Sequence, residues 1–107
     1  MNMQPAHISK AFQTFMTEAQ VQAQAWATLC QELEQANALD EKTGELTYLA
    51  VLAALRLESS IPFHVKMARK AGASREEVIS AILVGLPAAG HGVVQVLPAA
   101  VAAYDAE

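Results

Sequence analysis

The chain is poor in the residues that most often carry redox or metal chemistry. Cys30 is the only cysteine among 107 residues, so neither an internal disulfide nor a Cys-x-x-Cys redox or zinc motif can form. The three histidines, His7, His64 and His91, are scattered along the chain without a His-x-x-x-His pairing. We therefore expect no metal site and no cofactor.

Charged residues are also scarce, and they form no strongly basic cluster. They make up 17% of the chain, with 7 Lys and Arg against 11 Asp and Glu. Phosphate backbones are bound by basic surfaces, so we expect no nucleic-acid partner. Hydrophobic residues instead reach 53%, above the usual ~45–50%. Because so short a chain has little interior, the excess apolar surface predicts a subunit interface and a homo-oligomer.

The longest uncharged stretch runs from Val78 to Tyr104. Its length alone would suit a transmembrane helix. However, prolines and glycines interrupt it, and no basic flank follows, so two short buried helices around the Gly90-His91-Gly92 turn are the better interpretation. The first ten residues also lack the apolar core of a secretory signal. We therefore expect a cytoplasmic protein without a membrane span.

Apolar residues recur at helical spacing over most of the chain, and nothing indicates a strand. A stripe from Ile8 to Leu33 predicts one long helix, or two with a break at residues 17–20. The next helix, from Asp40 to Arg56, is apolar nearly all round, which predicts that it is central and the most buried. Asp40 is its expected N-cap.

The second half of the chain carries clear helix-end signals. A helix should begin at Ser59 or Ser60, with Pro62 in its first turn, and end at Gly72. The Ser74-x-x-Glu77 capping box opens the next helix. Residues 88–92 break it, and a last helix over 93–103 is expected to kink at Pro98. The expected fold is one all-α domain, residues 1–107, with five to six helices.

Glu45 and His64 are the two residues best suited to proton transfer. Glu45 lies one turn inside the most apolar helix, so it either faces solvent near the helix start or acts as an acid/base group in an apolar setting. His64 follows a helix start, where the positive end of the helix favours a neutral imidazole that accepts a proton. We expect His64 to be buried, to face an internal pocket and to lie within one water of Glu45.

Ser60 and His91 are weaker candidates for substrate contacts. Ser60 lies one turn before His64, which suggests a Ser–His pair, but capping the helix is the simpler role. His91 lies between two glycines, which predicts a tight turn with a close backbone approach.

Residues 39–92 resemble the carboxymuconolactone decarboxylase family, which includes the alkylhydroperoxidase D-like proteins. The resemblance rests on LDEKTGELTYLAVLAAL and on PFHVKMARKAGASREEVISAIL, in that order and spacing. Peroxidase members have a Glu, eleven residues, Cys-x-x-Cys, three residues and a His. Here the Glu falls on Glu45, the cysteines on Leu57 and Ser60, and the His on His64.

The resemblance implies an all-helical subunit that assembles as a trimer or hexamer. It also implies proton chemistry on a lactone or small organic acid, as in a decarboxylase or isomerase, because that branch needs no cysteine. Two alternatives stay open: a non-catalytic oligomeric scaffold or ligand binder, and a thiol-dependent antioxidant. The antioxidant is disfavoured because Leu57 and Ser60 cannot run a Cys-x-x-Cys cycle.

One geometric difficulty accompanies the Glu45–His64 pair. With a rise of 1.5 Å per residue, a plain antiparallel hairpin that turns at residues 57–60 offsets the two side chains by roughly 12 Å. A steep helix crossing, an irregular connection or a neighbouring subunit must close that gap.

Overall fold

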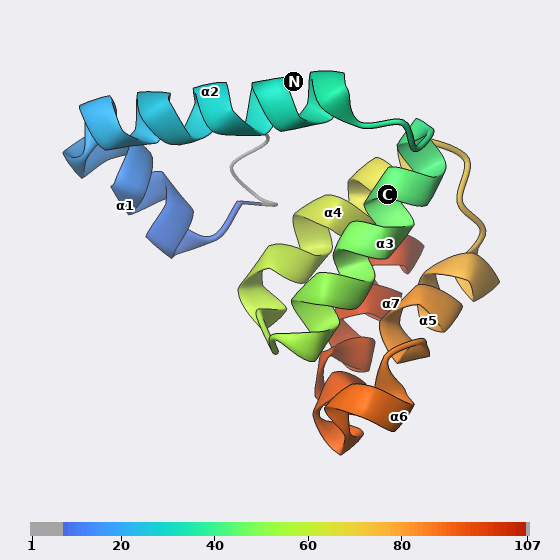
Figure 1. Ribbon diagram of the computed structural model, residues 1–107. Helices are drawn as coiled ribbons and strands as arrows, with labels where there is room; N and C mark the ends of the chain where they lie inside the picture. Colours follow the sequence, from blue (N-terminus) through green and yellow to red (C-terminus); the bar gives the residue numbers. More distant parts are fainter. Residues whose placement is uncertain (1–7, 107) are drawn as a thin grey trace. The chain divides into compact units, whose positions relative to one another are not determined.

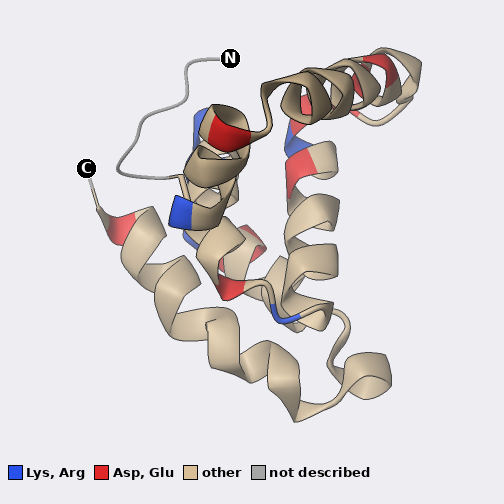
Figure 2. Ribbon diagram, turned by 90° about the vertical axis from the view of Figure 1, so that its left-hand side faces the viewer, with Lys and Arg blue, Asp and Glu red and all other residues tan. Residues whose placement is uncertain are grey.

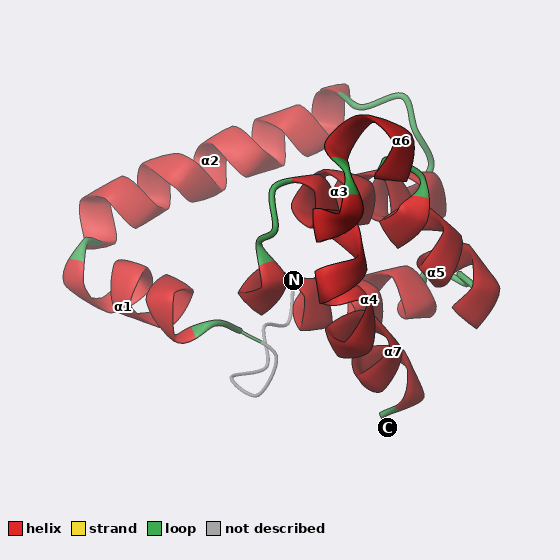
Figure 3. Cartoon of the chain, turned by 90° about the horizontal axis from the view of Figure 1, so that it is seen from below, coloured by secondary structure: helices red, strands yellow, loops and turns green. Residues whose placement is uncertain are grey.

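The computed structural model describes residues 8–106, and every regular element in them is helical (Figure 3). The expectation of an all-α fold is confirmed. By internal contacts the chain forms two compact units, one ending at Leu39 and one beginning at Asp40. The single domain over residues 1–107 stays a prediction.

The first unit is a pair of helices, α1 (Lys10–Glu18) and α2 (Gln20–Ala36). The hydroxyl of Ser9 caps α1 by accepting the Phe12 backbone N–H at 3.1 Å. Ala19 leaves the helical region at φ −132° and ψ 59°, and this separates the two helices. Of the two alternatives, one long helix or two with a break at residues 17–20, the structure shows the second.

The apolar stripe of this unit is only partly covered. Phe12 packs its ring against Trp26, with centroids 5.1 Å apart. No residue of α1 or α2 is buried, however, and Leu29 and Leu33 remain 53% and 61% exposed. Cys30 lies half-buried on the stripe, where desolvation raises the pKa of its thiol. Helices without a buried face gain little hydrophobic stabilisation, so this unit needs a further packing partner.

The second unit is the helical bundle that holds the core. Its elements are α3 (Glu41–Ala54), the 3₁₀ turn η2 (Glu58–Ser60), α4 (Ile61–Lys70), α5 (Arg75–Leu83), the single turn α6 (Leu86–Ala89), η3 (His91–Val96) and α7 (Leu97–Asp105). In Figure 1, α3 packs against α4 and α5, and α7 packs behind α4. Each contributes fully buried side chains to one core, among them Leu49, Ile61, Val65, Ile82 and Ala100. Within residues 8–106, six helices have nine residues or more, as the sequence predicts.

The helix ends follow the local signals of the sequence. The Asp40 carboxylate accepts the Thr43 N–H at 2.8 Å and caps α3. The Ser74 hydroxyl accepts the Glu77 N–H at 3.0 Å, and the Glu77 carboxylate accepts the Ser74 N–H at 2.8 Å, which completes the capping box. Gly72 adopts φ 98° just beyond α4. All three predicted signals are confirmed, because each acts within four residues.

As predicted, α3 is the central helix of the bundle, since it packs against α4, α5 and η3, but it is not covered on every face in the single chain. Leu49, Leu52 and Ala53 point into the core, but Tyr48, Val51 and Leu55 are 45%, 52% and 62% exposed. These three residues recur at steps of three and four, so they share one helix face. We call them the α3 stripe. The bundle covers only one side of this apolar helix.

The uncharged C-terminal segment also differs from expectation. Figure 2 shows α7 without a charged residue until Asp105. Residues 91–96 form the 3₁₀ turn η3, and α7 begins only at Leu97. Pro98 therefore lies in the first turn of a new helix and does not kink a longer one. In a first turn the backbone N–H groups have no intrahelical acceptor, so a proline without an N–H breaks no hydrogen bond there. No helix in residues 8–106 is long and apolar enough to cross a membrane.

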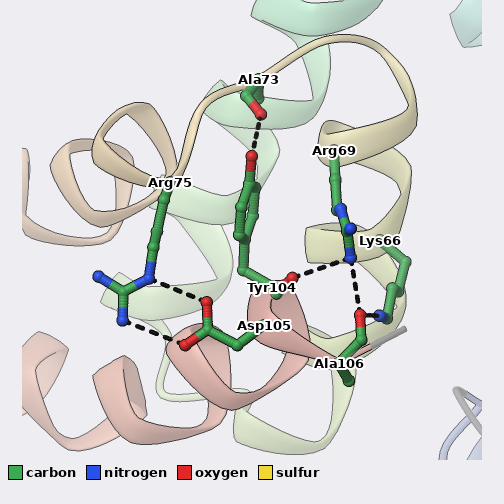
Figure 4. A network of polar contacts seen from close by, with 7 residues as sticks. All are labelled: Lys66, Arg69, Ala73, Arg75, Tyr104, Asp105 and Ala106. Carbon is green, nitrogen blue, oxygen red and sulfur yellow. Dashed lines mark hydrogen bonds and ion pairs between the residues drawn. The ribbon is translucent and has the colours of Figure 1, made fainter.

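Cationic side chains hold the end of α7 (Figure 4). Arg69 donates to the Tyr104 carbonyl at 3.0 Å and to the Ala106 carbonyl at 2.7 Å, and Lys66 donates to the Ala106 carbonyl. Arg75 pairs with Asp105 through two bonds, at 2.9 and 3.2 Å. The last carbonyls of a helix lack backbone partners and carry a negative partial charge, so these cations stabilise the terminus.

We expect the bundle to lose stability in acid. The pKa values of Asp40, Glu77 and Asp105 lie below normal, mainly through the Thr43 backbone N–H, the Ser74 backbone N–H and Arg75, respectively. A carboxyl whose folded pKa is lowered stabilises the fold above its unfolded pKa and loses that contribution as pH falls through the folded pKa. Thermal midpoints should therefore drop below about pH 4. Glu77→Gln should weaken that drop, and a midpoint constant down to about pH 3 would contradict the prediction.

Candidate active site

Glu45 and His64 meet directly on the second unit. Glu45 lies on α3 and His64 on α4, and the Oε2 atom of the carboxylate is 3.0 Å from Nδ1 of the imidazole. Both side chains are mostly covered, with 21% and 24% of their surface exposed. At this separation a carboxylate and an imidazole share a charge-assisted hydrogen bond. The pair forms within one chain.

An irregular connection closes the gap that a plain hairpin leaves. Arg56 adopts φ 59°, and beyond it the Leu57 N–H donates to the Leu52 carbonyl at 3.0 Å. This bond brings Leu57 back beside the last turn of α3 before the 3₁₀ turn η2 begins. With ~2.0 Å per 3₁₀ residue and 1.5 Å per α-helical residue, His64 then lies about 12 Å along from Leu57. Along α3, Glu45 lies about 12 Å from Ala53, which belongs to the last turn of the helix, beside Leu57. Because α4 runs back along α3, His64 and Glu45 therefore lie at the same level.

Aromatic rings flank the imidazole. The Tyr48 ring centroid is 4.5 Å from that of His64, and the Phe63 centroid is 5.1 Å away at an edge-to-face angle of 87°. Tyr48 comes from α3, one turn beyond Glu45, so both reach His64 from one helix face. With Nδ1 donating to the carboxylate, Nε2 is left as the nitrogen that accepts or delivers a proton.

The surroundings of the pair differ from the expected internal pocket. His64 is not fully buried, since 24% of its side chain is exposed. A shallow apolar groove lies between α3 and α5, and its lining residues are Leu46, Thr47, Ala50, Glu76, Glu77, Ser80, Ala81 and Val84. Neither Glu45 nor His64 lines it. The single chain therefore leaves one side of the pair open to water.

Ser60 does not join His64 in a nucleophile pair. It occupies the N-cap position of α4, but its hydroxyl makes no capping bond. Among the residues that the structure describes, no hydrogen bond links Ser60 to His64. The expected side-chain cap is therefore wrong, because the preceding turn η2 already gives Ser60 helical angles of φ −89° and ψ −13°.

His91 begins η3 and is exposed, and the glycine after it shows the expected close approach. A Cβ on Gly92 would lie 2.1 Å from Nε of Arg56, so a larger residue there would require the Arg56 side chain to move. Sequence reasoning singled out neither Arg56 nor Tyr48. Nothing in the sequence indicates the conformation of Arg56, because a positive φ is rare for an arginine. Tyr48 could have been found, because it lies three residues after Glu45 and therefore on the same helix face.

Residues 8–106 contain no group of three or more His, Cys, Asp and Glu side chains that could hold a metal ion.

Comparison with known proteins gives a family but no individual relative. No curated protein and no solved structure matches the chain. The family model described as "Carboxymuconolactone decarboxylase family" matches residues 20–103, from α2 to α7. This match covers most of the sequence, including Glu45, His64 and the helices that carry them. The chain therefore belongs to the carboxymuconolactone decarboxylase family.

Proposed function

We propose that this protein is a small acid/base enzyme that moves a proton on a lactone or small organic acid. The observation that carries the proposal is the 3.0 Å contact between Glu45 and His64. A carboxylate held against one imidazole nitrogen fixes the tautomer and leaves the other nitrogen to exchange a proton with a substrate. A decarboxylase or isomerase reaction of this kind needs no thiol, metal or bound cofactor.

The proposed reaction centres on Nε2 of His64. In an isomerase, Nε2 takes a proton from the carbon next to the substrate carbonyl, and the electron pair of that C–H bond moves to the carbonyl oxygen as an enolate. Glu45 stabilises the imidazolium, which then returns the proton to another position. In a decarboxylase, CO₂ leaves first with its bonding pair left on the substrate, and Nε2 of His64, protonated beforehand from solvent, supplies the proton that ends the reaction.

The experiment is a solvent-exchange assay. Small lactones and carboxylic acids are incubated with the protein in D₂O, and NMR follows the loss of the C–H signal next to the carbonyl, together with any new product. Exchange of at least one compound that depends on His64 supports the proposal. Absence of exchange, isomerisation and CO₂ release across the panel contradicts it.

The partial exposure of the pair favours a second candidate, a non-catalytic ligand binder or oligomeric scaffold. An enzyme usually excludes water from its reacting groups, whereas this pair is open on one side and lies outside the apolar groove. A binder would show saturable shifts of the His64 imidazole signals with a small organic acid, without any exchange or turnover.

Peroxidase activity should be absent. The positions for the two thiols are occupied by Leu57 and Ser60. Desolvation raises the pKa of the Cys30 thiol, which lowers the fraction of reactive thiolate at neutral pH. An assay with an alkyl hydroperoxide and a dithiol reductant should give the same rate for the wild type and for Cys30→Ala. Turnover that disappears in Cys30→Ala would overturn this prediction.

We also propose that the chain assembles as a homo-oligomer, a trimer or a hexamer. The support is the uncovered apolar surface: α1 and α2 have no buried residue, and the α3 stripe is exposed. Apolar faces of this kind usually mark interfaces. Light scattering should give a mass of at least three subunits, and a stable monomer at micromolar concentration would contradict this proposal.

A further inference from the structure

A single hydrogen bond does not fix the orientation of the His64 imidazole. Within residues 8–106, the Glu45 carboxylate is the one hydrogen-bond partner of this ring, at 3.0 Å from Nδ1. The torsion that turns a histidine ring about its Cβ–Cγ bond is broad and roughly two-fold. A turn by 180° would place a ring carbon where Nδ1 lies and would break the bond to Glu45. A further contact is therefore needed to restrict the rotation of the ring.

Tyr48 makes such a contact from the same helix as Glu45. The ring centroids of Tyr48 and His64 lie 4.5 Å apart, with an angle of 48° between the ring planes. Packed aromatic rings have centroid separations of about 4.5–7 Å, so this pair is at the close end of the range. Phe63 also contacts the imidazole, at 5.1 Å. However, Phe63 precedes His64 on α4, so it cannot tie the ring to α3.

Packing of the hydrophobic core does not explain the position of the Tyr48 ring. Tyr48 belongs to the α3 stripe and is 45% exposed, whereas Leu49 and Leu52 of the same helix are buried in the core. Hydrophobic stabilisation grows with the apolar area removed from water, so a ring that stays half in water gains only part of it. The contact with His64 is therefore a feature of the candidate active site and not of the core.

We infer that Tyr48 is a positioning residue for His64. Glu45 holds the edge of the imidazole that carries Nδ1, and the Tyr48 ring, one helical turn later, restricts the rotation of the imidazole. Both act from α3, which its own buried residues anchor in the core. Nε2 is thereby kept in one orientation for a substrate. This consequence for catalysis rests on the proposed function; the restraint on the ring does not.

With a responsive substrate, Tyr48→Leu should lower kcat by about 2–10-fold, the population change that the energy of an aromatic pair corresponds to at 25 °C. KM should stay unchanged, because the ring of Tyr48 orients His64 and does not bind the substrate. In a His64→Asn background the same substitution should have no further effect, since a residue that acts through His64 has nothing left to orient. An equal loss in both backgrounds would show that Tyr48 acts on the substrate itself and would overturn the positioning role.

The decisive test needs no substrate and follows the Nδ1 proton of His64 by NMR. This proton exchanges with water when the ring turns out of its hydrogen bond, so the exchange rate reports the population of the turned form. Tyr48→Leu removes the aromatic ring but keeps an apolar side chain, and it should speed the exchange by about 2–10-fold. Tyr48→Phe keeps the ring and loses only the hydroxyl, so its exchange rate should equal that of the wild type.

Leu55→Ala is the matched control, because it shortens another exposed side chain of the α3 stripe, about two helical turns from Tyr48. It should leave the exchange rate unchanged, and far-UV circular dichroism should show the same helical content for all three variants. An unchanged rate in Tyr48→Leu, an equal acceleration in Leu55→Ala, or a Tyr48→Phe rate as fast as that of Tyr48→Leu would each overturn the inference. Because the free protein is measured, an inactive protein would not affect this result.

Discussion

Replacing His64 with asparagine should slow proton exchange into a responsive substrate by about 10²–10⁴-fold, the usual contribution of a general acid/base group. Asparagine keeps a polar side chain in the place of the imidazole but cannot take up a proton at neutral pH. The loss should appear in kcat more than in KM, because proton transfer belongs to the chemical step. The assay is the solvent exchange followed by NMR.

Glu45→Gln provides the companion variant. Removing the charge but keeping the shape should cost about 10–100-fold, as for other groups that orient a histidine. The matched control is Glu41→Gln, which removes an exposed carboxylate one turn earlier on α3. A Glu41→Gln variant as slow as Glu45→Gln, or a His64→Asn variant with wild-type rate, would contradict the assignment.

The largest effect on folding should come from Leu49→Ala. Leu49 is fully buried on the inner face of α3, where it packs within the core of the second unit. Leucine-to-alanine changes at such positions destabilise by about 2–5 kcal/mol, because they combine lost hydrophobic transfer with a cavity. Urea unfolding should show this as a lower midpoint with an unchanged slope.

Leu39→Ala is the control for this variant. Leu39 precedes the bundle and is 51% exposed, so its truncation should change the free energy of unfolding by less than about 0.5 kcal/mol. Equal effects of the two substitutions on the free energy of unfolding would show that burial in the single chain does not determine stability. They would also contradict the position of Leu49 in the core of the second unit.

The sequence predicts the helices and their ends well, because the determining interactions are local. Asp40, Gly72 and the Ser74–Glu77 capping box each act within one helical turn. The spacing of apolar residues left open one long helix or two over the stripe from Ile8 to Leu33, and the structure shows two, separated at Ala19. Glu45 could be selected as an acid inside the apolar helix α3, and His64 as an imidazole in an early turn of α4.

The features that could not be predicted from the sequence depend on how the chain connects one helix to the next. The meeting of Glu45 and His64 requires the reversal at Arg56 and the turn η2, and an arginine carries no signal for positive φ. The apolar composition of α3 predicts that the helix is buried, but it does not indicate whether residues of the same chain cover every face of it. The exposed α3 stripe shows that the bundle does not cover that face.

The central claim is that Glu45 orients His64, and the imidazole tautomer tests it most directly. Long-range nitrogen–proton NMR distinguishes which ring nitrogen of neutral His64 carries the proton, and it requires no substrate. With Nδ1 held 3.0 Å from the Glu45 carboxylate, the wild type should hold the proton on Nδ1. In Glu45→Ala the proton should move to Nε2, the form that free imidazole side chains prefer. A wild type with the proton already on Nε2, unchanged by Glu45→Ala, would contradict the account.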